Sequence, residues 1–169
     1  MFLYSFNEFE QKHSQVIDLC QCIEYELKYI NHYLLMVDGY STNFLMDLTM
    51  RELVNLLRDS LDDSKFVDKY DLYYDGQTII SLLIPVIRDR NFWAHNSFTD
   101  LRFAKNDKET VESSNVYDGV CQRLKKSLVD FQRISNLCQK YRLKIENSIK
   151  KIGYTLLSKT YYTKQNEVK

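Results

Sequence analysis

Apolar residues recur at spacings of three and four from about residue 6 to residue 37, which lays a continuous stripe along one side of a helix. The stripe consists of Val16, Leu19, Cys20, Ile23, Leu27, Ile30 and Leu34. The pair Asp38-Gly39 follows, and a glycine directly after the last periodic residue can take the left-handed conformation that ends a helix. The pattern therefore predicts one long helix over residues 6–37. Its two histidines, His13 and His32, are interpreted as surface or packing residues.

A second, short helix is predicted to begin near Thr49. Thr49 and Glu52 have the spacing of a capping box, in which each side chain accepts a hydrogen bond from the other residue's backbone N–H. Leucines at 53, 56 and 57 give this helix one buried edge. Residues 62–71 lose the pattern and carry an acidic excess, so we expect a loop or a short frayed helix there.

The third predicted helix opens at Asp75-Gly76, with Asp75 as its N-cap. The positions after it are apolar on nearly every side, which predicts the central and most buried helix of the protein: Ile79, Ile80, Leu82, Leu83, Ile84, Val86 and Ile87. Pro85 interrupts this run. Proline lacks an N–H, so it removes the bond to the Ser81 carbonyl, and we expect a kink or a local break.

Residues 97–114 are polar without a clear period and predict a connecting loop. A fourth, long helix follows, capped by one of residues 113–115 and running to about Ile152, with Gly153 ending it. The four patterns predict an all-α helical bundle of about four to five helices, with long first and last helices. We expect a helical domain over 1–153 and a basic C-terminal tail over 154–169, where either phosphate binding or a solvated surface explains the charge.

Composition supports this assignment. The chain has 169 residues, enough for one domain with a core, and only 4 Gly and 1 Pro, few for a turn-rich all-β protein. Its 23 basic residues balance 23 acidic ones, which excludes a globally basic nucleic-acid-binding surface, so any anion site must be local. No apolar run approaches the roughly 20 residues that cross a bilayer, and the N-terminus does not resemble a signal peptide. We expect a cytoplasmic protein without membrane contact.

The four cysteines lack the paired spacing of a zinc site. We interpret Cys20, Cys22, Cys121 and Cys138 as reduced thiols, mostly buried, and we expect no metal and no cofactor.

The segment 88–96, Arg-Asp-Arg-Asn-Phe-Trp-Ala-His-Asn, concentrates two guanidinium groups, amides and an imidazole directly after the apolar run. If it is helical at about 100° per residue, Arg88, Asn91 and His95 form one polar stripe. Arg90 then lies about 140° from His95, and it joins the site only if the helix unwinds or a second chain supplies it. Trp93 and Phe92 are interpreted as core residues on the back of this helix.

A histidine beside arginines, without cysteine or carboxylate companions at the spacing of metal ligands, suits phosphodiester chemistry better than metal binding. An imidazole can take the proton from a ribose 2′-hydroxyl or give one to the leaving 5′-oxygen. A guanidinium donates a planar fork to the phosphate oxygens. Such a site cleaves RNA without a metal, leaves a 2′,3′-cyclic phosphate, and cannot act on DNA in this way. From spacing alone, a structural or simply exposed role for these residues remains open.

The helix order and the string Arg90-Asn91-Phe92-Trp93-Ala94-His95 resemble the HEPN superfamily, whose hallmark is Arg, a polar residue, three residues of any type, and His. The looser form of the hallmark, Arg-x4-6-His, also fits Arg88 with His95. Which arginine binds the phosphate is therefore left open.

The resemblance implies a homodimeric, metal-independent endoribonuclease of the phage-defence or toxin kind, with two motifs facing each other across a two-fold axis. The implied catalytic residues are Arg90, Asn91 and His95, with Arg88 and Asn96 binding the substrate. RNA and an antitoxin protein are the implied partners. Members paired with nucleotidyltransferase antitoxins often carry Tyr two residues after the histidine, where this chain has Ser97.

Two other readings of the sequence remain. The chain can be a non-catalytic HEPN-like module, in which the same residues bind RNA or a nucleotide or hold a dimer together. Alternatively, it is a helical bundle that docks onto another protein through an aromatic surface containing Tyr70, Tyr73 and Tyr74.

Overall fold

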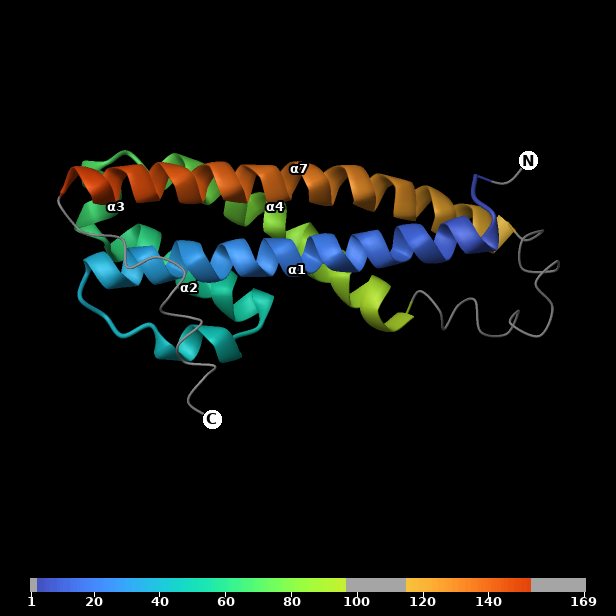
Figure 1. Cartoon of the computed structure of the whole chain (residues 1–169), viewed down its shortest axis with the longest axis horizontal. Helices are drawn as coiled ribbons and strands as arrows, with labels where there is room; N and C mark the ends of the chain where they lie inside the picture. The colour runs from blue at the N-terminus through green and yellow to red at the C-terminus, as the bar shows by residue number, and fades with distance from the viewer. Residues whose placement is uncertain (1–2, 97–114, 153–169) are drawn as a thin grey trace.

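The computed structural model describes residues 3–96 and 115–152, and this part of the chain is an all-α helical bundle, as predicted (Figure 1). Its elements are α1 (Phe6–Val37), η1 (Asn43–Asp47), α2 (Met50–Asp63), α3 (Lys65–Lys69), α4 (Tyr73–Asn91), η2 (Phe92–Asn96) and α7 (Asn115–Lys151). The predicted connecting loop over 97–114, the end of the last helix at Gly153 and the basic tail over 154–169 lie outside the described residues.

The long helices α1 and α7 lie side by side and run in the same direction along the molecule (Figure 1). Polar contacts join them at two levels. At one end the Tyr117 hydroxyl donates to the Tyr4 carbonyl at 3.0 Å, and further along Arg142 Nε donates to Glu26 at 2.6 Å. Arg142 also pairs with Glu146 one turn further along α7. The remaining elements pack against this parallel pair.

The predicted bounds of α1 are confirmed at both ends. Gly39 has φ +80°, the left-handed conformation expected where the helix ends. At the start, Ser5 and Glu8 form a capping box that the sequence analysis did not identify.

The predicted capping box of α2 is also present. The Thr49 backbone N–H donates to Glu52 at 2.7 Å, and the Glu52 backbone N–H donates to the Thr49 hydroxyl. The helix then runs three residues beyond Ser60, because Leu61 continues its buried edge one turn after Leu57. Of the two predictions for residues 62–71, the short helix is the one found, as α3.

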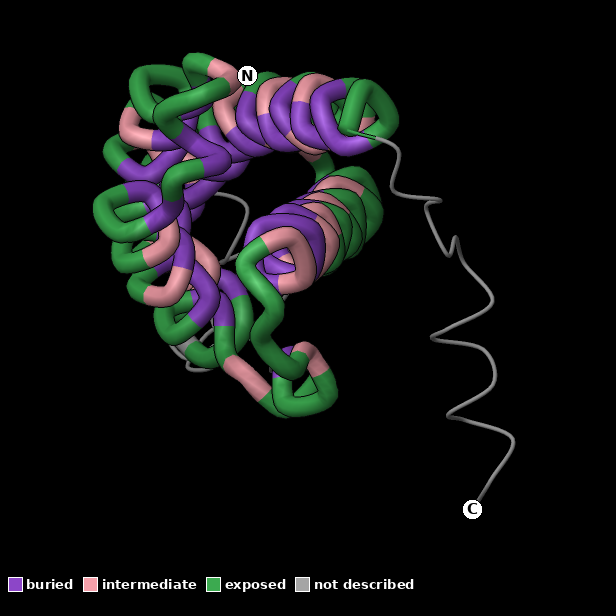
Figure 2. The backbone as a smooth tube through the Cα atoms, turned by 90° about the vertical axis from the view of Figure 1, so that its left-hand side faces the viewer, coloured by how far each residue is buried: buried purple, intermediate pink, exposed green. Residues whose placement is uncertain are grey.

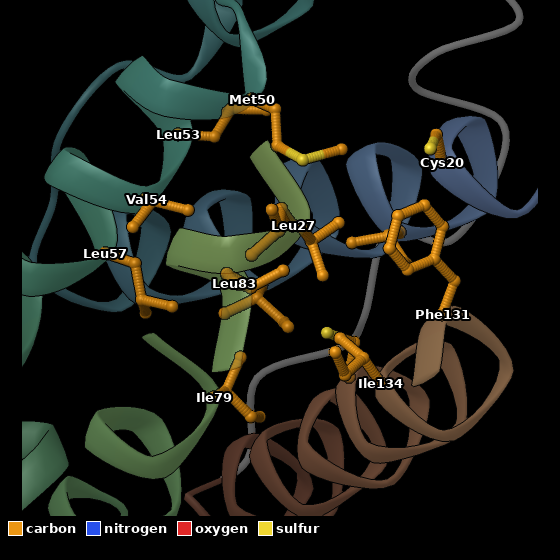
Figure 3. Close-up of a cluster of buried hydrophobic side chains, with 14 of the residues drawn as sticks. Cys20, Leu27, Met50, Leu53, Val54, Leu57, Ile79, Leu83, Phe131 and Ile134 are labelled. Atoms are coloured by element: carbon orange, nitrogen blue, oxygen red, sulfur yellow. The ribbon is translucent and has the colours of Figure 1, made fainter. Parts of the chain in front are cut away.

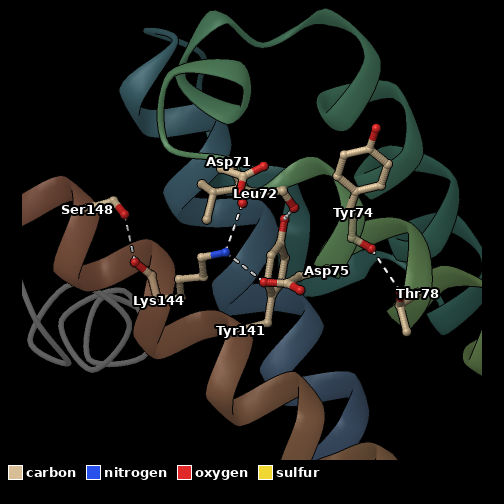
Figure 4. Close-up of polar contacts among 8 residues, drawn as sticks. All are labelled: Asp71, Leu72, Tyr74, Asp75, Thr78, Tyr141, Lys144 and Ser148. Atoms are coloured by element: carbon tan, nitrogen blue, oxygen red, sulfur yellow. Dashed lines mark hydrogen bonds and ion pairs between the residues drawn. The ribbon is translucent and has the colours of Figure 1, made fainter.

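The prediction that Asp75 caps the third helix is wrong. α4 begins at Tyr73, so Asp75 lies inside its first turn, where a carboxylate interacts favourably with the helix dipole. Lys144 of α7 donates to Asp75 Oδ2 at 2.7 Å and to the Asp71 carbonyl at 2.8 Å (Figure 4). The buried Tyr141 hydroxyl donates to the Leu72 carbonyl at 3.0 Å. These contacts fasten the start of α4 to α7.

The prediction that α4, apolar on nearly every side, is the most buried helix is wrong as well. Its buried residues, Gly76, Ile79, Ile80, Leu83 and Val86, follow one face. Ile84 on the other side is 56% exposed. α4 continues through Pro85 without a break, and Pro85 and Ser81 are both exposed, so water can satisfy the carbonyl that proline leaves without a donor. One side of α4 therefore remains apolar and open.

Buried positions alternate with exposed ones along every long helix (Figure 2). Side chains from α1, α2, α4 and α7 meet in one core, which includes Leu27, Leu53, Leu83 and Ile134 (Figure 3). Three of the four cysteines are buried, as predicted, and Cys22 is exposed. Burial raises the pKa of the Cys20 and Cys138 thiols to about 12, so both remain protonated.

Over residues 3–96 and 115–152, none of the helices combines the length and the hydropathy needed to cross a bilayer.

Candidate functional site

The candidate residues lie where α4 ends and its backbone changes. Arg88, Arg90 and Asn91 occupy the last turn of α4, and His95 lies in the π-helical turn η2 that follows. A π turn contains more residues than an α turn and is frequent at functional sites. The regular α-helical geometry considered for residues 88–95 therefore holds only as far as Asn91.

The π turn changes which side chains share a face. Because it is wider, each residue advances by less than the roughly 100° of an α-helix. Over four residues this rotates His95 away from Arg88 and toward the side of Asn91 and Arg90. Arg90 needs such unwinding to share a face with His95 within one chain.

Trp93 anchors the π turn to the rest of the bundle. Its side chain is fully buried, as predicted, and its indole Nε1 donates to the Ser127 hydroxyl of α7 at 3.0 Å. Nε2 of His13 in α1 lies 2.8 Å from the Trp93 carbonyl oxygen, which can only accept, so Nε2 donates this hydrogen bond. The same tryptophan is thus held from both long helices.

A second anchor comes from Asp89, the acidic residue of the segment. Arg123 of α7 donates to the Asp89 carboxylate at 2.7 Å. The Arg123 guanidinium also lies 3.6 Å from the ring centroid of Phe92, within the range of a cation–π contact. Arg88 lies farther from the same carboxylate, at 3.9 Å. Asp89 is therefore held mainly by α7.

Three of the remaining polar side chains of the segment, those of Arg88, Asn91 and His95, are open to solvent. Arg88 is 78% exposed at its side chain, Asn91 and His95 are exposed, and Arg90 is half-buried. The structure brings Arg90 and Asn91 together, with Arg90 Nη1 donating to Asn91 Oδ1 at 3.4 Å. Asn96 closes the π turn, and its side chain lies outside the described part of the structure.

This arrangement separates supporting residues from exposed ones. The backbone from Asp89 to Trp93 is fixed from behind by α1 and α7, while amide, guanidinium and imidazole groups face outward at one end of α4. A site of this kind can bind a phosphate and exchange protons with its ester oxygens. Within residues 3–96 and 115–152, no cluster of three His, Cys, Asp or Glu side chains could hold a metal ion.

The supporting roles of Asp89, Arg123 and Ser127 were not predicted from the sequence, and His13, interpreted as a surface or packing residue, packs against Trp93. For Asp89 a signal was present, since an acidic residue between two arginines implies a carboxylate that needs a partner. Arg123 and Ser127 form two adjacent positions, one turn apart on α7, which is visible only once α7 is known to pass behind the segment.

The chain matches no protein-family model, no curated protein and no solved structure.

Proposed function

We propose that this protein is a metal-independent endoribonuclease of the HEPN type, acting in phage defence or as a toxin. The observation that carries the proposal is the exposed set Arg88, Asn91 and His95, with Arg90 beside Asn91, on a backbone fixed by Trp93 and Asp89. Within the segment Trp93 is buried and Phe92 is partly buried, while Arg88, Asn91 and His95 are exposed to solvent.

In the proposed reaction His95 takes the proton from the ribose 2′-hydroxyl, and the resulting oxygen attacks the adjacent phosphorus. The phosphorus–5′-oxygen bond breaks, and a protonated imidazole supplies the proton that the leaving oxygen needs. The guanidinium of Arg90 or Arg88 stabilises the extra negative charge on the phosphate oxygens. Asn91 positions Arg90 through the bond at 3.4 Å. The products are a 2′,3′-cyclic phosphate and a 5′-hydroxyl.

One imidazole cannot be base and acid at the same moment, so a second proton donor is needed. A second copy of the chain, placed with its motif opposite the first, supplies another His95 and another pair of arginines. We therefore propose that the active species is a homodimer. An antitoxin partner belongs to the same proposal.

The test uses the purified full-length chain with single-stranded RNA in excess EDTA. Cleavage is expected to continue under chelation and to give products that end in a 2′,3′-cyclic phosphate. His95→Ala is expected to reduce the rate by at least a hundredfold, the usual contribution of a general acid or base. Because His95 is exposed, this substitution leaves the fold intact, which circular dichroism checks.

Two substrates serve as controls. DNA of the same sequence and RNA with 2′-O-methyl groups both lack the attacking hydroxyl, so neither is cut. Cleavage of either substrate, or full activity of His95→Ala, refutes the proposed mechanism. RNA binding without any product favours the non-catalytic binding module instead.

A further inference from the structure

A groove runs between α2 and α4, on the side of α4 that the core leaves open. It has a volume of about 510 Å³ and is lined by Arg51, Val54, Asn55, Arg58, Ile84, Pro85, Ile87 and Arg88. Arg88 belongs both to this groove and to the segment that carries His95. The groove therefore begins at the candidate site and leads away from it.

Helical spacing explains why these side chains line one groove. On α2, residues 51, 54, 55 and 58 follow the three-and-four spacing of a single face. On α4, Ile84, Ile87 and Arg88 do the same. Each helix buries a neighbouring face in the core, with Leu53 and Leu57 on α2 and Leu83 on α4, and Val54 belongs to both faces of α2. The lining is therefore a second face of the same two helices that adjoins the buried one.

The groove is positively charged. Among the residues that the structure describes, neither Arg51 nor Arg58 forms an ion pair with a carboxylate, and Arg58 donates only to Asn55 at 3.4 Å. Arg88 lies 3.9 Å from Asp89, whose closer partner is Arg123. Glu52, next to Arg51 in the α2 sequence, is occupied by the capping box with Thr49. Asp59, next to Arg58 in the sequence, forms no ion pair with it. Three guanidinium groups thus face the groove with little local compensation.

We infer that this groove holds the RNA strand on one side of the cleavage point, with phosphates on the arginines and bases against the apolar floor. The inference rests on the proposed function and extends it from the reacting phosphate to the neighbouring nucleotides. Arg51 and Arg58 lie two turns apart, about 10.5 Å along α2, so they suit two separate phosphates of a strand better than one phosphate. Ile84, Pro85 and Ile87 offer the apolar surface that unpaired bases can cover.

The experiment measures binding of a short, fluorescently labelled single-stranded RNA to the full-length chain by anisotropy. His95→Ala is present in every protein sample, so that the RNA stays intact. The double variant R51Q/R58Q is expected to weaken RNA binding roughly tenfold or more. It is also expected to reduce the slope of log affinity against log salt concentration by about 1.4, which is about 0.7 for each of the two lost phosphate contacts. Arg133→Gln removes one exposed arginine from α7, outside the groove, and is expected to bind as its parent does.

Competition separates a strand site from a simple phosphate site. Inorganic phosphate and adenosine monophosphate are added to the complex of labelled RNA and protein. The strand assignment predicts that neither displaces the RNA below about a millimolar. Displacement by either one at lower concentration means that the groove binds a single phosphate and overturns the assignment.

Kinetics with His95 intact distinguish this inference from the proposed function. R51Q/R58Q is expected to raise KM with little change in kcat, since the groove binds substrate and transition state alike. If His95-dependent cleavage occurs and R51Q/R58Q binds and cleaves as Arg133→Gln does, the groove assignment fails while the nuclease stands. If RNA binding depends on the groove but no RNA is cut, the nuclease fails and the groove stands. A change in oligomeric mass with unchanged RNA affinity identifies a protein interface and overturns the RNA assignment.

Discussion

Gly76 lets α4 approach α2 and α7 closely, and replacing it by alanine tests the packing that fixes α4. A Cβ atom at this position would lie 2.6 Å from Leu61 Cδ1 and 2.8 Å from the Tyr141 hydroxyl oxygen. Both distances are shorter than van der Waals contact. Leu61 and Tyr141 are themselves buried, so neither side chain can move into solvent.

The expected magnitude follows from three contributions. Alanine gains up to about 1 kcal/mol over glycine inside a helix. Overpacking a filled core costs typically about 1–3 kcal/mol. Moving Tyr141 weakens its bond to the Leu72 carbonyl, which adds about 1 kcal/mol. Gly76→Ala is therefore expected to lower the free energy of unfolding by about 1–3 kcal/mol.

The matched control is the same substitution at Gly119 on α7. Nothing lies within 4 Å of a Cβ built there, so only the helix-propensity gain remains. Gly119→Ala is expected to raise the free energy of unfolding by about 0.5–1 kcal/mol. Urea denaturation followed by the fluorescence of Trp93, the single tryptophan, measures both variants. A Gly76→Ala protein as stable as Gly119→Ala would refute the close packing described for α4.

Two further predictions concern buried polar groups. Ser127→Ala leaves the buried indole N–H of Trp93 without its acceptor and is expected to lower the free energy of unfolding by about 1–3 kcal/mol, measured by urea denaturation. The control Ser135→Ala on the same helix is expected to change it by less than about 0.5 kcal/mol. Equal effects of the two substitutions would contradict the role of Ser127 in anchoring Trp93. Burial lowers the pKa of His32 below its ordinary value, so protonation of His32 favours the unfolded chain. The contribution of neutral His32 to stability is complete above about pH 6.5, the ordinary pKa, and is lost as the pH falls toward the lower pKa of the folded state. Melting temperatures measured from pH 7.5 down to 5 should fall more steeply in the wild type than in His32→Gln, and parallel curves would show that His32 is not the titrating group.

Local patterns predicted most of the helices correctly because each depends on residues that are close in sequence. The three-and-four spacing of apolar residues identified α1 to its last residue. The Thr49–Glu52 pair identified the start of α2, since a capping box is made within one turn. Where the local signal was weaker, the prediction failed. Asp75 resembles an N-cap, but α4 begins two residues earlier, at Tyr73, where Lys144 and Tyr141 of α7 contact residues 71–75.

The candidate site was predictable only in part. The sequence identified the segment 88–96 and the buried Trp93 within it. It could not identify the π turn, because the contacts around this turn come from residues far away in sequence. His13 is 80 positions from Trp93, whose carbonyl it contacts, and Arg123 is 34 positions from Asp89, to which it donates.

The sequence by itself determined the helical class, the extent of the long helices and the segment that gathers the reactive side chains, since all three are set by spacing and residue type within a few turns. Only the tertiary structure decided which face of α4 is buried. The buried face depends on where α1, α2 and α7 contact α4. The apolar run of α4 is continuous in sequence, but one face of it packs in the core and another lines the open groove. The same packing holds the π turn from behind and leaves His95 exposed to solvent.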